Sequence, residues 1–175
     1  MENGLLYTFS TIAQALGGAF ALLSAFVLYR FQSLDRAMWE DSNQIRGEFS
    51  RIAEGDLQWF DTLRVQGRYA ELVEKIEAVV NQKGIQSVFS VGQVEFYYRL
   101  QASVRLHGRL ARAFKRSAWV TGAVMLGSVA VIPFAHLVYC LEVFSWTLLL
   151  VGVCGFAACL GMYWAVIEAA LYKEE

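Results

Sequence analysis

The sequence predicts an all-α integral membrane protein with three transmembrane helices and a cytoplasmic helical bundle inserted between the first and second spans. Hydrophobic residues make up 57% of the chain, the mean hydropathy is +0.40, and there is a single proline. Stretches of apolar residues at 4–30, 117–139 and 144–172 each reach the ~20 residues that a helix needs to cross a bilayer. A polar segment, 31–116, separates the first from the second.

The first span, 4–30, has no charged residue before Arg30. A cleaved signal peptide is the alternative interpretation of such a start. It is disfavoured because no positive charge precedes the apolar stretch, which is about twice the length of a signal's hydrophobic region.

Polar and small residues of this span recur at alternating steps of three and four, so they share one helix face. After Tyr7, the members of this face are Ser10, Gln14, Gly17, Ala21 and Ser24. Two interpretations remain open: the small residues allow close helix packing, or the hydroxyls and the amide line a pore within a ring of identical helices. In the second case these five residues are the pore-lining candidates.

The middle segment, 31–116, is expected to form a helical domain whose long first and last helices are continuous with spans one and two. An apolar stripe that includes Leu34, Met38 and Ile45 continues the first helix. We expect a short helix at 57–65, then an amphipathic helix at 69–82 that ends before Gly84. Ser90 and Gln93 have the spacing of a capping box, so the last helix is expected to open there.

The second and third spans, 117–139 and 144–172, are expected to form a hairpin. Pro133 removes a backbone hydrogen bond, so we expect it to kink the second span. Small residues of the third span, Gly152, Gly155 and Gly161 among them, indicate close helix packing.

Positive charge sets the expected orientation. Lys and Arg gather at both ends of the middle segment, which predicts that this segment and the C-terminus are cytoplasmic and the N-terminus is outside. We expect a multi-pass protein of the inner (plasma) membrane.

The sequence contains none of the spacings that would indicate an enzyme. It has two histidines, far apart, and no Cys-x-x-Cys, phosphate-binding glycine loop or His-Glu-x-x-His motif. We therefore expect no catalytic residues, no metal site and no cofactor.

Two other groups of residues are candidates for a site. Arginines at steps of four, three and four form one stripe before the second span, suited to anionic lipid headgroups or to an anionic ligand; they are Arg105, Arg109, Arg112 and Arg116. The candidate protonatable residues are His107, His136 and Glu168. Balanced charge in the middle segment makes nucleic acid an unlikely partner.

These features favour a homo-oligomeric channel or pore, with span one around the axis and the cytoplasmic domain as gate or sensor. The alternative is a membrane-anchored interaction or regulatory protein that oligomerises through its spans and binds a cytosolic partner. A secondary transporter fits less well, because three spans show neither an internal repeat nor an interrupted helix.

Overall fold

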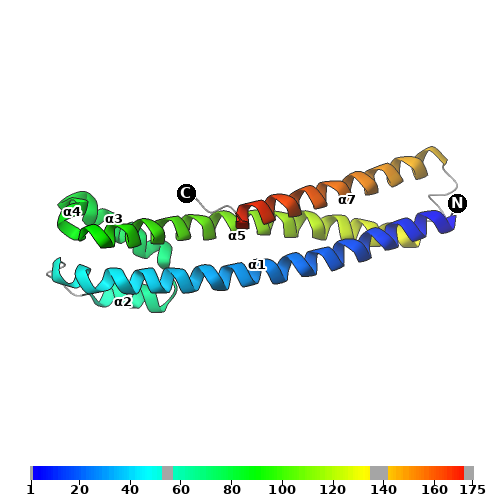
Figure 1. The fold of residues 1–175 in the computed structure, drawn as a ribbon. Coiled ribbons are helices and arrows are strands. Elements are labelled where there is room, and N and C mark those ends of the chain that lie inside the picture. Colours follow the sequence, from blue (N-terminus) through cyan, green and yellow to red (C-terminus); the bar gives the residue numbers. More distant parts are fainter. Residues whose placement is uncertain (1, 53–56, 135–141, 172–175) are drawn as a thin grey trace. The chain divides into compact units, whose positions relative to one another are not determined.

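Helices form the secondary structure of the described residues, which in the computed structural model are 2–52, 57–134 and 142–171. Within these ranges there is no β-strand. The elements, drawn in Figure 1, are α1 (Glu2–Ile52), α2 (Gln58–Val65), α3 (Tyr69–Lys83), α4 (Ile85–Val88), α5 (Val91–Val131), the 3₁₀ turn η1 (Ile132–Phe134) and α7 (Glu142–Leu171). The all-α prediction is therefore confirmed for this part of the chain.

Two helices are exceptionally long: α1 has 51 residues and α5 has 41. Neither contains a proline, because the single proline of the chain follows α5. Glycines such as Gly17 and Gly47 lie inside α1 without interrupting it, since a glycine costs an α-helix only about 1 kcal/mol relative to alanine.

The described residues divide into two compact units. The apolar unit contains residues 2–28, 109–134 and 142–171, and the polar unit contains residues 29–52 and 57–108. Helices α1 and α5 therefore each contribute to both units.

Within the apolar unit, the N-terminal part of α1, the C-terminal part of α5 and α7 lie side by side (Figure 1). The rings of Phe20 and Phe114 stack with their centroids 5.7 Å apart and join α1 to α5. Phe20 also packs against Tyr163 of α7, at 6.3 Å. Leu16 and Val27 of α1 are almost completely buried in this interior, so each helix contributes a packed face.

The polar unit packs the C-terminal part of α1 and the N-terminal part of α5 with the short helices α2, α3 and α4. The expected apolar stripe of α1 is confirmed at Leu34, Met38 and Ile45, which are all buried. Ile76 of α3 and Leu100 of α5 are fully buried as well. The unit thus has a hydrophobic core of its own.

Glycines end two of the segments in this unit. Gly67, between α2 and α3, has φ of 69°, and Gly84, after α3, has φ of 81°. These conformations favour glycine because a Cβ atom would be strained. The expected end of the helix before Gly84 is confirmed, while the four-residue helix α4 that follows was not anticipated.

The kink expected at Pro133 stays a prediction, because residues 135–141, which would continue the helix, lie outside the described ranges. The α-helix ends at Val131, and Pro133 lies inside the 3₁₀ turn η1. A proline disfavours α-helical geometry in the residue before it, which explains why α5 stops at this point. The end of the expected second span, 135–139, lies outside the described residues.

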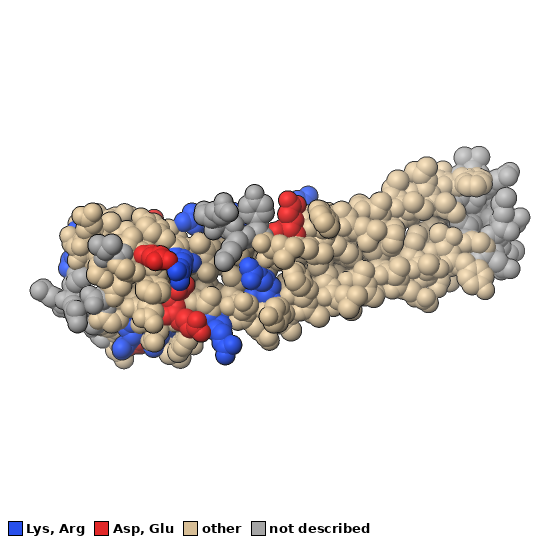
Figure 2. All heavy atoms as spheres, in the orientation of Figure 1, with Lys and Arg blue, Asp and Glu red and all other residues tan. Residues whose placement is uncertain are grey.

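Among the described residues, two helices are long and apolar enough to cross a membrane by length and composition, Leu6–Gly47 and Trp146–Leu171. In each, only 22% of the most apolar window is buried inside the chain. Figure 2 shows that uncharged residues form most of the visible surface over the apolar unit. Large apolar side chains such as Leu22, Leu150 and Trp164 are exposed there, as expected for a surface that contacts lipid or other membrane helices.

Candidate functional site

The pore-lining candidates occupy two different positions around α1. Gln14 and Ala21 are exposed, whereas Ser10, Gly17 and Ser24 are half-buried. An added Cβ atom at Gly17 would lie 3.4 Å from the methyl group of Met125, so this glycine faces α5. Ser24 donates its hydroxyl to the carbonyl of Phe20 at 2.8 Å, within its own helix.

Six exposed polar and small residues of α1 follow a related but rotated pattern. They recur at alternating steps of four and three and form what we call the exposed stripe: Tyr7, Thr11, Gln14, Gly18, Ala21 and Ala25. An added Cβ atom at Gly18 would meet nothing within 4 Å. No other part of the described chain lies against Gly18, so the stripe is open at this residue. Tyr7 and Thr11 of the stripe line a surface groove with Val153 and Phe156 of α7.

A row of buried hydroxyl groups lies inside the apolar unit, on α5. Ser117, Thr121 and Ser128 are at most 3% exposed. Thr121 shares a hydrogen bond of 2.9 Å with the hydroxyl of Tyr163, and Ser128 donates to the carbonyl of Val124. The hydroxyl of Ser117 has no hydrogen-bond partner among the described residues. These hydroxyl groups were not predicted as site residues, although their spacing of four and seven residues on one helix face could have indicated them.

The four arginines of the predicted stripe, Arg105, Arg109, Arg112 and Arg116, are all exposed on α5. Arg105 belongs to the polar unit and donates to the side-chain oxygen of Gln101 at 2.7 Å. The other three belong to the apolar unit, where Arg109 and Arg112 have interactions of their own. Lys115 is also exposed on this helix, next to Arg116. This end of α5 in the apolar unit therefore carries four basic residues, Arg109, Arg112, Lys115 and Arg116.

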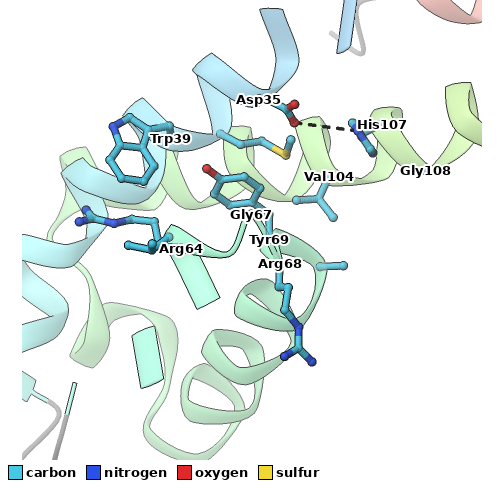
Figure 3. A pocket seen from close by; sticks show the side chains of 12 residues that line it. Asp35, Trp39, Arg64, Gly67, Arg68, Tyr69, Val104, His107 and Gly108 are labelled. Carbon is cyan, nitrogen blue, oxygen red and sulfur yellow. Dashed lines mark ion pairs between the residues drawn. The ribbon is translucent and has the colours of Figure 1, made fainter. Parts of the chain in front are cut away.

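His107 lies in a groove of the polar unit between α1 and α5. Its ring packs 4.6 Å from the ring of Phe31, and its Nε2 atom lies 3.9 Å from Oδ1 of Asp35. Figure 3 shows His107 and Asp35 facing each other across the two helices. A protonated imidazole would therefore have an ion-pair partner here. The His107 side chain is 40% exposed, so solvent reaches the imidazole.

The groove has a volume of about 570 Å³ and receives residues from α1, α2, α3 and α5. Met38, Tyr69 and Val104 supply apolar surface, and Asp35 and His107 supply polar groups. Burial raises the pKa of the Tyr69 hydroxyl, so it remains a neutral hydrogen-bonding group. The Arg68 side chain extends away from Asp35 and His107 in Figure 3.

Arg64 forms one wall of this groove. Its guanidinium lies 4.6 Å from the centre of the Trp39 ring and donates to the Asn43 amide oxygen at 2.8 Å. Its side chain is 13% exposed, and its Nε atom is buried without a hydrogen-bond partner in the described structure. These contacts fix Arg64 against α1 and give the groove a stable wall.

The other protonatable candidates are Glu168 and His136. Glu168 is exposed on α7 of the apolar unit, and His136 lies outside the described residues. The described ranges contain no cluster of three His, Cys, Asp or Glu side chains that could hold a metal ion.

The chain matches no protein-family model, and no curated protein or solved structure is significantly similar to it.

Proposed function

We propose that the chain forms a homo-oligomeric membrane channel in which α1 lines the axis and the polar unit acts as gate or sensor. The single observation that supports this proposal most directly is the exposed Gln14, which lies within the apolar N-terminal part of α1. An amide transferred from water to hydrocarbon without a hydrogen-bond partner costs roughly 2–7 kcal/mol. A stable position for Gln14 therefore requires water or another protein helix beside it.

The exposed stripe supports the proposal that α1 helices of neighbouring subunits lie beside Gln14. Gly18, Ala21 and Ala25 have little or no side chain, so the backbones of neighbouring α1 helices can approach closely. Thr11 and Gln14 supply an oxygen and an amide to the same face. A ring of such faces would surround a narrow, uncharged and partly polar path.

In the proposed topology the chain crosses the inner membrane three times, at 4–30, 117–139 and 144–172. The basic residues near Arg109 and Arg116 lie on the cytoplasmic side, because positive charge is retained there. The polar unit is then cytoplasmic, and its helices α1 and α5 are continuous with two of the spans. A change at the His107 groove could in this way reach the spans through two helices.

The test is flux through the purified protein in liposomes, with the oligomeric mass measured in the same preparation. Gln14→Leu should reduce conductance severely while leaving the oligomer intact, because a bulky apolar side chain replaces the amide on the axis. Ala15→Leu is the matched control: Ala15 is exposed beside Gln14 but lies outside the stripe, so conductance should persist. Equal effects of the two substitutions would contradict the assignment of the axis to the stripe.

A membrane-anchored regulatory protein is the second candidate, favoured by the groove of the polar unit. A cavity of about 570 Å³ lined by aromatic, acidic and imidazole side chains is of the size that small ligands or a partner's side chains occupy. If the purified oligomer conducts nothing at any pH or voltage, and Tyr69→Ala abolishes binding of a cytosolic protein, this second function replaces the first.

A further inference from the structure

A second groove lies on the surface of the apolar unit, along one face of α5. It has a volume of about 410 Å³ and almost no polar surface. Its lining residues recur at helical spacing: Lys115, Ala118, Trp119, Gly122, Ala123 and Leu126.

The shape of this groove follows from the size of its side chains. Small residues at Ala118, Gly122 and Ala123 form the floor, and the larger Trp119 and Leu126 rise beside it. Trp119 is 74% exposed and Leu126 is 73% exposed, so both project from the helix. An added Cβ atom at Gly122 would meet nothing within 4 Å, which shows that the floor is open.

One end of the groove is basic. Lys115 lines it directly, Arg112 lies one helical turn earlier on the same face, and Arg116 is the next residue along the chain. All three side chains are exposed. Trp119 lies one turn beyond Lys115, and an indole ring with an apolar body and a polar N–H is typical of the boundary between headgroups and hydrocarbon. The face therefore changes from cationic to apolar across that boundary.

We propose that this groove binds an anionic phospholipid, with the phosphate on Lys115 and its neighbouring arginines and one acyl chain along Gly122 to Leu126. The length agrees with this assignment. From Lys115 to Leu126 the helix rises about 16 Å, at roughly 1.5 Å per residue. The apolar lining from Ala118 to Leu126 accounts for about 12 Å of this rise at roughly 1.5 Å per residue. Half of the hydrocarbon core is about 15 Å thick, so the apolar lining extends along most of an acyl chain of one leaflet.

Charge favours lipid over a second copy of the chain as the occupant. Two identical faces packed against each other would bring Arg112, Lys115 and Arg116 close to their own counterparts, and like charges repel. An anionic headgroup instead neutralises them, at about 1 kcal/mol for each basic residue near the surface. The proposal rests on the insertion of the apolar unit in a membrane, but it is independent of conduction.

The oligomer is purified from bilayers that contain equal parts of phosphatidylglycerol and phosphatidylcholine. Native mass spectrometry then measures which lipid stays bound, and how much of it per chain. Wild type should retain phosphatidylglycerol preferentially. Gly122→Leu fills the floor without removing charge and should reduce the retained lipid by about tenfold or more, the equivalent of about 1.4 kcal/mol. Gly127→Leu is the matched control, because an added Cβ atom at Gly127 also meets nothing within 4 Å and this residue does not line the groove.

Replacing the basic residues with uncharged ones tests the headgroup end of the site separately from the acyl-chain groove. Lys115→Gln combined with Arg112→Gln should remove the preference for phosphatidylglycerol over phosphatidylcholine. Inorganic phosphate, which lacks acyl chains, should not displace the bound lipid at equal concentration. The proposal is overturned if both lipids are retained equally by wild type, if phosphate displaces the lipid, or if the two glycine variants behave alike. It is also overturned if Gly122→Leu dissociates the oligomer while the lipid bound per chain is unchanged, which would identify the groove as a subunit interface.

Discussion

The hydroxyl groups of Thr121 and Tyr163 lie 2.9 Å apart and join α5 to α7 in the interior of the apolar unit. Thr121 is 1% exposed and Tyr163 is 6% exposed. In such an interior neither group can exchange its partner for water, so the pair specifies which residues of the two helices face each other.

The first prediction concerns the strength of this pair. Thr121→Val and Tyr163→Phe remove one hydroxyl each with little change of shape. We expect each substitution to lower the unfolding free energy in detergent, and the double-mutant cycle to give a coupling of about 0.5–1.5 kcal/mol, the range of hydrogen bonds between membrane helices. Ser128→Ala is the control. Its hydroxyl bonds within α5, so its effect should add to that of Tyr163→Phe without coupling.

The second prediction compares two glycines of α7. An added Cβ atom at Gly152 would lie 2.8 Å from Cε1 of Phe9, a side chain that is 4% exposed and has little room to move. Gly152→Ala should therefore destabilise the apolar unit, because overpacking costs about 1–3 kcal/mol and the gain in helix propensity is about 1 kcal/mol. Gly161→Ala should be neutral or stabilising, since nothing lies within 4 Å of the added atom. Thermal unfolding of both variants in one detergent is the measurement, and Phe9→Leu should suppress the effect at Gly152.

Local periodicity predicted much of the fold. The stripe of Leu34, Met38 and Ile45 is buried, and α3 ends at the glycine with a positive φ, Gly84. These features depend on side-chain spacing and on backbone geometry, both of which are properties of a short segment. The same stripe includes Ser42, which is 0% exposed and bonds the carbonyl of Trp39. A hydroxyl satisfied by its own helix can occupy a core position, which explains why it did not interrupt the stripe.

The rotation of each helix about its own axis could not be predicted from the periodicity of a short segment. The face predicted from the sequence includes Ser10, Gly17 and Ser24. The exposed stripe includes Thr11 and Gly18 instead. Tyr7, Gln14 and Ala21 belong to both faces, and consecutive residues lie about 100° apart on a helix, so shifting the other members by one residue rotates the face by about 50°. Which of two adjacent faces is covered depends on contacts with distant parts of the chain, such as the approach of Met125 to Gly17, and no single helix specifies these.

The third prediction is a pH dependence in the polar unit. Arg46 donates two hydrogen bonds of 2.6 Å to the carboxylate of Asp61, and these bonds hold the pKa of Asp61 below its usual range. A carboxyl whose folded pKa is lowered stabilises the fold above its unfolded pKa, which is about 3.9, and the contribution is lost as the pH falls through the folded value. The effect should be small, because the Asp61 and Arg46 side chains are 34% and 44% exposed.

Hydrogen exchange of the α2 amides, corrected for the intrinsic rate at each pH, measures this contribution. Asp61→Asn should reduce protection of α2 at neutral pH, and its difference from wild type should shrink as the pH falls below the unfolded pKa and through the lowered folded pKa. Glu95→Gln is the control, since its ion pair with Arg99 lies within α5. A difference between Asp61→Asn and wild type that persists at the lowest pH would show that the carboxylate charge is not the cause.

The fourth prediction concerns the wall of the His107 groove. Arg64→Lys keeps the positive charge but loses the planar group that stacks on Trp39 and reaches Asn43. We expect α2 to open more readily, with amide exchange about tenfold faster, which corresponds to about 1.4 kcal/mol. In a Trp39→Leu background the same substitution should have a smaller effect, because the stacking partner is already absent. Arg68→Lys is the matched control, since Arg68 pairs with Glu71 on the surface and both side chains are about half exposed, at 53% and 46%. If the two lysine variants accelerate exchange equally, the contact with Trp39 does not hold α2 against α1.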